Sequence, residues 1–189
     1  MPIVALVEAS VMYERSEEFW RTELSGYSTA MLHRNNLLAV KGDIVSQQDH
    51  RLSPLSRCGQ FDIRLYGREL TVLIVDVASN LFVSREEALR KLAEIVSGLN
   101  DRPVIIVGDF NTPDDSVWFD PLRQQARSGM RSAGSGYAAT WPNPLPVLTL
   151  DQLWFNDRCN VYSCCAGWTA LSDHRPLFAA FRSATNEEK

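Results

Sequence analysis

The sequence has few cysteines, no long apolar run and no excess of positive charge. Its four cysteines include the adjacent pair Cys164-Cys165, an awkward geometry for a disulfide, and none follow the CxxC spacing of zinc sites. We therefore expect buried thiols on strands and a reducing compartment. No stretch is apolar enough to cross a bilayer, and no basic-then-apolar leader opens the chain, so we expect a soluble, cytoplasmic protein.

The acidic balance disfavours a protein that binds nucleic acid mainly through bulk positive charge. The formal net charge is −4 and the pI is about 5.4, whereas such proteins need clustered Lys and Arg. A nuclease is not excluded, because the carboxylates of a metal site lower the total. The length of 189 residues fits one domain, which we expect over residues 1–183, with a disordered tail over 184–189.

Strand patterns dominate the chain and two helices lie between them, which favours an α/β fold. Strands are expected at 3–8, 27–32, 37–40, 61–66, 70–77, 104–107, 148–155, 160–165 and 177–181, helices at 13–24 and from Ser84 onward, and polar loops at 47–56 and 123–136. Ser84 and Glu87 have the spacing of a capping box. The predicted architecture is a two-sheet β-sandwich flanked by helices, in four layers α/β/β/α.

Chemically useful side chains follow or interrupt three of the expected strands. Asp109 and Asn111 come directly after the apolar run 104–107, Asp151 interrupts an apolar strand, and Asp173-His174 precede the last strand. A charge inside a strand costs several kcal/mol, on the order of a buried charge, unless it is paired. Asp151 therefore needs a partner, and His174 is the obvious one.

These residue types suit the hydrolysis of a phosphate ester. Carboxylates that hold Mg²⁺ or Mn²⁺ supply a Lewis acid, and an oriented His with an amide stabilises the charge that develops on the phosphoryl oxygens. Taken singly, each residue has a plainer interpretation. Asp109 is a turn former beside Gly108, Asn111 is a cap, and His174 is a surface histidine. The combination of all three segments outweighs those interpretations.

The ordered segments GDFN (108–111), LDQLWF (150–155) and SDHRP (172–176) resemble the motifs of the endonuclease/exonuclease/phosphatase superfamily. That group includes apurinic-site endonucleases, pancreatic-type deoxyribonucleases, inositol-polyphosphate phosphatases and bacterial sphingomyelinases. Glu8, which ends the first apolar run, resembles the early glutamate of the family. The resemblance implies that Glu8 binds a divalent metal ion, Mg²⁺ or Mn²⁺, and that Asp173 lies at or near it.

The same resemblance implies the remaining roles. Asp109 would align or deprotonate the attacking water, and Asn111 would hold the phosphate or that water. His174 would stabilise the phosphoryl oxygens or act as acid and base, with Asp151 orienting its ring. Trp118 follows GDFN closely and is a candidate to line the substrate cleft.

Two departures from the family pattern bear on partners. The family usually opens with a strand ending in Trp-Asn, whereas this sequence begins at the glutamate strand, which leaves a strand slot open and invites homodimerisation there. Many relatives carry Asn-x-His where this chain has Asp76 and Ala78, so Asn80 is the candidate phosphate ligand. This variant resembles a bacterial branch often tethered behind membrane helices, which implies tethering in a longer parent protein.

Three functions are open at this point. The first, which is the leading hypothesis, is a metal-dependent phosphodiesterase or endonuclease acting on nucleic acid. The second is a phosphatase or phosphodiesterase for a small or lipid phosphoester, which the acidic balance favours slightly. The third is a catalytically weak relative that acts as a binding module.

Overall fold

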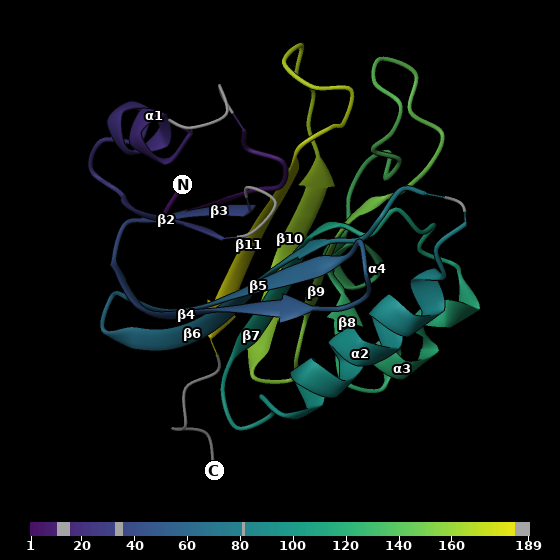
Figure 1. Ribbon diagram of the computed structural model, residues 1–189, viewed down its shortest axis with the longest axis horizontal. Coiled ribbons are helices and arrows are strands. Elements are labelled where there is room, and N and C mark those ends of the chain that lie inside the picture. The colour runs from purple at the N-terminus through teal and green to yellow at the C-terminus, as the bar shows by residue number, and fades with distance from the viewer. Residues whose placement is uncertain (11–15, 33–35, 81, 184–189) are drawn as a thin grey trace.

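The computed structural model describes residues 1–10, 16–32, 36–80 and 82–183 (Figure 1). The strands are β1 (Ile3–Leu6), β2 (Ser28–Leu32), β3 (Asn36–Val40), β4 (Asp43–Arg51), β5 (Arg57–Leu65), β6 (Arg68–Asp76), β7 (Val104–Asp109), β8 (Arg127–Ser128), β9 (Asp151–Phe155), β10 (Cys159–Ala166) and β11 (Leu177–Ser183). The helices are α1 (Ser16–Glu23), α2 (Arg85–Ser97), the 3₁₀ turn η2 (Val117–Phe119), α3 (Asp120–Arg123) and α4 (Gly129–Ala133).

Six strands form the main sheet, in the order β4-β5-β6-β7-β9-β8. The pair β6–β7 is parallel and its neighbours are antiparallel, so the sheet is mixed. Helix α2 makes the crossover that a parallel pair requires. Its apolar side packs on one face of this sheet through Leu89, Leu92 and Val96, in a core that also holds Trp154.

The opposite face of the main sheet packs against two further sheets. One has the order β1-β3-β2 and the other is the hairpin β10-β11. A second core joins all three sheets, and it contains Leu38 of β3, Ile74 of β6 and Val161 of β10. The α/β fold with mixed sheets and few helices is therefore confirmed, and the four-layer order stays a prediction.

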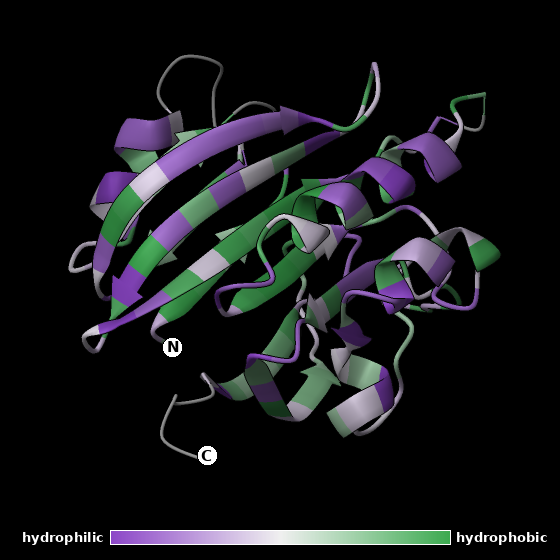
Figure 2. Cartoon of the chain, turned by 90° about the horizontal axis from the view of Figure 1, so that it is seen from below, coloured by the Kyte–Doolittle hydropathy of each residue, from purple (hydrophilic) through white to green (hydrophobic). Residues whose placement is uncertain are grey.

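Two segments expected to be loops are structured. Strand β4 covers 47–51, the first half of the expected loop 47–56, and Figure 2 shows a largely hydrophilic strand at the edge of the main sheet. It lies at the edge of the sheet with most side chains exposed, so polar residues are tolerated and the apolar alternation is missing. The expected connection 123–136 contains β8 and α4, whose Gly/Ser-rich sequence hides a helix capped by Ser128. The Ser84 side chain makes no cap hydrogen bond, so the predicted capping box is wrong although the helix forms.

The cysteines fit the expected thiol pattern. Cys58, Cys159 and Cys164 are buried and reduced, and burial raises the pKa of the Cys159 thiol to about 12. None of the helices in the described ranges is long and apolar enough to span a bilayer. The expected helix start at Tyr13 and the tail at 184–189 lie outside the described residues.

Candidate active site

Three aspartates lie in one row across neighbouring strands of the main sheet. Asp76 ends β6 and pairs in register with Asp109 at the end of β7, which pairs in turn with Asp151 at the start of β9. Neighbouring strands lie about 4.8 Å apart and register partners project from the same face. The three carboxylates therefore lie side by side, on the same face of the sheet and at the same end of these three strands.

The GDFN segment holds the central carboxylate in place. Gly108 has φ +142°, and a Cβ there would lie 2.0 Å from the carbonyl oxygen of Val75, so only glycine allows β7 to approach β6 this closely. Asn111 adopts φ 44°, a left-handed conformation that asparagine tolerates. In this turn its backbone N–H and its Nδ2 each donate to the Asp109 carboxylate at 2.8 Å.

His174 and Asp151 form the expected pair. The distance between His174 Nδ1 and Asp151 Oδ2 is 2.8 Å, and both side chains are half-buried. Ser172 Oγ accepts from the His174 backbone N–H, and Thr140 Oγ1 accepts from the Asp151 backbone N–H. These bonds fix both partners and leave His174 Nε2 as the ring nitrogen outside the pair.

Electrostatics in this cluster perturb two titratable groups. Burial raises the pKa of Asp109 to about 6, and the nearby Asp151 carboxylate adds to the shift. The hydrogen bond to Asp151 raises the pKa of His174, and its charge and that of Asp109 raise it further. A partly buried carboxylate with a raised pKa beside an oriented imidazole is typical of a catalytic site.

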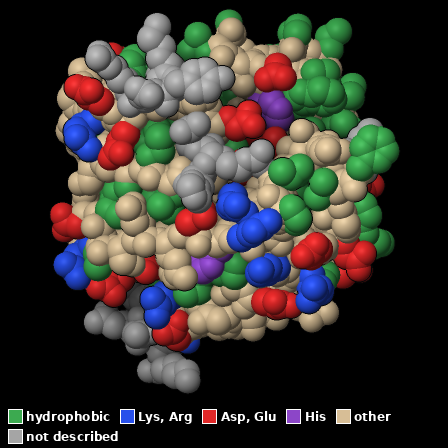
Figure 3. All heavy atoms as spheres, in the orientation of Figure 1, with side chains coloured by type: hydrophobic (Ala, Val, Ile, Leu, Met, Phe, Trp, Pro, Cys, Tyr) green, Lys and Arg blue, Asp and Glu red, His purple; other side chains and the backbone are tan. Residues whose placement is uncertain are grey.

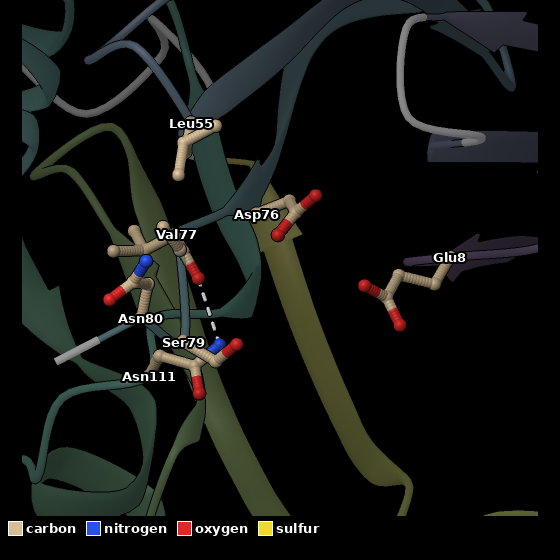
Figure 4. A pocket seen from close by; sticks show the side chains of 8 residues that line it. Glu8, Leu55, Asp76, Val77, Ser79, Asn80 and Asn111 are labelled. Carbon is tan, nitrogen blue, oxygen red and sulfur yellow. Dashed lines mark hydrogen bonds between the residues drawn. The ribbon is translucent and has the colours of Figure 1, made fainter. Parts of the chain in front are cut away.

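A cavity of about 190 Å³ opens beside the cluster and includes Glu8 and Asp76 in its wall. Figure 4 shows the Glu8 carboxylate across this space from Asp76, on a separate segment of the chain. Asn111 also lines the cavity, and its Nδ2 donates to both Val77 O and Asp109 at 2.8 Å. Asp109, Asp151 and His174 are not in the cavity wall, and Asn111 connects them to it.

The donor set fits a hard divalent cation. Asp109, Asp151 and His174 each offer one ligand atom within 4.8 Å of the others. Carboxylates in a row repel one another, which the raised Asp109 pKa reflects, and oxygen-rich sets of this kind suit Mg²⁺ or Mn²⁺. Glu8 and Asp76 line the neighbouring cavity and are candidates to hold an ion there, but among the described residues only Asp109, Asp151 and His174 bring three ligand atoms this close together.

The other residues expected at the site lie at varied positions. Asp173 is exposed, accepts from Trp141 Nε1 at 3.2 Å and lies close enough to His174 to raise its pKa. Asn80 lines the cavity, and its Oδ1 accepts from the Phe82 backbone N–H. Trp118 lies in η2 and belongs to neither the cavity wall nor the aspartate–histidine cluster.

Asp76, expected from the sequence only as a substitution for the family's asparagine, is a buried member of the row. The signal was present. The apolar run 72–75 is followed directly by Asp76, much as the apolar run 104–107 is followed by Gly108 and Asp109.

Comparisons with known proteins show the family and the fold of the chain. A model of the Endonuclease/Exonuclease/phosphatase family matches residues 10–174. A mannosyl-6-phosphatase from Bacteroides thetaiotaomicron has a similar structure, with a TM-score of 0.80 at 15% identity over 96% of this chain and 85% of the other. The human Nocturnin catalytic domain gives 0.73 at 18% identity, over 96% of this chain and 81% of the other.

TDP2 from D. rerio, in complex with a single-stranded DNA product, also gives a TM-score of 0.73, at 11% identity over 96% of this chain and 86% of the other. No curated protein sequence matched. Identities this low show a shared fold and leave the substrate open.

Proposed function

Because the chain belongs to the endonuclease/exonuclease/phosphatase family, we propose that it hydrolyses phosphodiester bonds with the help of a divalent metal ion. The observation that carries the proposal is the 2.8 Å bond between His174 and Asp151, with Asp109 beside them. An imidazole oriented by one carboxylate next to a second carboxylate of raised pKa is a matched acid and base pair.

Each residue has a role that follows from its contacts. Asp109, held by Asn111, aligns the attacking water and accepts its proton, for which a pKa of about 6 is suitable. His174 donates from Nε2 to a phosphoryl oxygen as negative charge develops, and Asp151 keeps the ring in the required tautomer. Glu8 and Asp76, which line the cavity, would hold a Mg²⁺ or Mn²⁺ ion, and that ion would polarise the phosphoryl group. As the family resemblance implies, Asp173 would help bind the ion, and Asn80, which lies in the cavity wall, would bind the phosphate.

Of the two substrate classes that the sequence left open, the charge around the site favours the small or lipid phosphoester over nucleic acid. A nucleic-acid groove needs Lys or Arg free to contact phosphates. Arg57 begins β5 opposite Asp76, but its guanidinium donates to two backbone carbonyls and lies 3.8 Å from Asp49. Arg85 likewise donates to the Ser79 carbonyl.

The assay compares plasmid DNA, an abasic duplex and a generic bis-aryl phosphodiester, each with Mg²⁺ or Mn²⁺. We expect turnover of the generic ester, and its loss in Asp109→Ala and His174→Ala. His50→Ala is the matched control, because His50 lies on the edge strand β4 bonded to Gln60. Efficient nicking of plasmid would assign nucleic acid instead. No turnover, with no metal-induced rise in melting temperature, would favour the non-catalytic binding module.

The homodimer expected from the sequence remains part of the proposal. Strand β1 lies at an edge of its sheet and pairs with β3 alone among the strands described. An edge of this kind accepts a strand from a second copy. Sedimentation velocity across a range of concentrations tests this, and a strictly monomeric profile would rule it out.

A further inference from the structure

Two loops next to the candidate active site expose large apolar side chains. The loops are 137–149 and 166–172, together called here the apolar rim. Leu171 is 96% exposed, Leu145 80%, Val147 70%, Trp168 64% and Tyr137 61%. Single exposed apolar residues are ordinary, but five on two adjoining loops form a surface that calls for a partner.

The rim is rigidly built, although its side chains face solvent. The guanidinium of Arg175 is buried and donates to the carbonyls of Tyr137 and Ala139 in one loop and to those of Ala166 and Gly167 in the other. A cation buried in this way ties the loops together through charge-assisted hydrogen bonds. The exposed side chains are therefore held in place on a fixed backbone.

A second set of contacts joins the two loops at their tips. Asn143 Nδ2 donates to the carbonyls of Thr169 and Ser172, and the Trp168 ring lies over the Arg175 guanidinium, 4.5 Å from it. The Trp168 side chain is thus ordered while it remains largely exposed. Ordering exposed apolar groups costs little on binding, because their conformational entropy is already lost.

The rim adjoins the catalytic groups. Trp141 in the first loop donates to the Asp173 carboxylate, and its ring centroid lies 6.5 Å from that of His174. Figure 3 shows hydrophobic side chains gathered on this face where Figure 1 places the loops that lead into β9 and out of β10. A phosphoester held at His174 would therefore have an apolar surface immediately beside it.

The two loops contain no Asp, Glu, Lys or Arg in residues 137–149 and 166–172. An uncharged apolar surface offers nothing to the phosphates of a nucleic acid. The net charge of −4 disfavours an anionic membrane, so charge complementarity points to a neutral interface. We infer that the apolar rim docks on a zwitterionic phospholipid surface and presents its phosphodiester headgroups to the active site, an inference that rests on the proposed phosphodiesterase function.

The test is flotation of the full chain with phosphatidylcholine vesicles in EDTA, which prevents turnover. We expect the wild-type protein to float with the vesicles. Leu145→Ser and Leu171→Ser should each lower the partition coefficient about tenfold, because each leucine that leaves hydrocarbon forfeits its transfer free energy. Val147→Ser is compared with Val45→Ser, a valine 53% exposed on β4 at the end of the strand away from the site.

The outcomes separate the rim from the chemistry. If the wild-type protein cleaves the generic bis-aryl phosphodiester but does not float with the vesicles, membrane docking through the apolar rim is refuted and the proposed function still stands. If the protein floats, only the rim variants lose vesicle binding, and no ester is cleaved, docking through the apolar rim is supported. The proposed hydrolysis of phosphodiesters is then refuted. If Val45→Ser lowers vesicle binding as much as Val147→Ser does, the proposed docking through the apolar rim is refuted. Concentration-dependent sedimentation without vesicles, abolished by the leucine changes, would reassign the surface to contact between copies.

Discussion

Replacing Asp109 by asparagine should stabilise the metal-free protein and abolish its activity. The structure gives the Asp109 carboxyl a pKa of about 6 instead of 3.8, because it is buried beside other carboxylates. A shift of roughly two units corresponds to about 3 kcal/mol of destabilisation when the group is ionised. The variant loses the bond from Asn111 Nδ2, a cost of about 1 kcal/mol, so the net gain should be roughly 1–2 kcal/mol.

The gain should depend on pH in a defined direction. Below about pH 4 the carboxyl is protonated in folded and unfolded chains alike, so wild type and variant should differ little in this term. Between about pH 4 and pH 6 the unfolded chain loses the proton first, so wild-type stability falls relative to the variant. Above about pH 6 the difference is complete, which for a chain of this size means roughly 3–6 °C in melting temperature.

Thermal melts in EDTA from pH 4 to pH 8 measure this difference. Added Mg²⁺ or Mn²⁺ should stabilise the wild-type protein more than Asp109→Asn, because the ion relieves repulsion that the variant lacks. A variant that is less stable than wild type at pH 8, or a difference that does not change with pH, would refute the electrostatic account of the row. Asp114→Asn, a change of the same type at an aspartate with an arginine partner, serves as the control.

Three further results are expected. His174→Ala should lower kcat roughly 10²- to 10⁴-fold with little change in KM, measured on the generic phosphodiester. Asp151→Asn should lower the imidazole pKa of His174, followed by NMR titration, because the bond to Asp151 is the main cause of its elevation; an unchanged titration would contradict the pairing. Gly108→Ala should destabilise the fold by about 3 kcal/mol or more in urea, since its Cβ would meet Val75 O, whereas Gly67→Ala, also at positive φ but with open space around it, should cost less.

The sequence indicated the chemical groups of the site better than their spatial order. The partnership of Asp151 with His174 was predictable, because a carboxylate within an apolar strand requires a partner and few histidines are available. The row from Asp76 to Asp151 was not, since it depends on which strands are neighbours and on their register, and local patterns contain neither.

The errors in the predicted fold have similar causes. Strand β4 is polar because it lies at an edge, so the apolar alternation that marks other strands is missing. Helix α4 has only five residues, and its stability comes from packing against β10 and β9 rather than from helix propensity. The apolar rim could not be predicted from the sequence, because apolar residues that are exposed have the same sequence pattern as apolar residues that are buried.

The division of the smaller layer into two sheets has a mechanical consequence. No ladder in the described chain ties β1-β3-β2 to β10-β11, and the two sheets are joined through side-chain packing in the core that they share with the main sheet. Glu8 follows β1 of the first sheet, whereas His174 precedes β11 of the second. An ion and a phosphate bound by Glu8 and His174 together would link the two sheets. Binding should then slow amide exchange in both sheets at once.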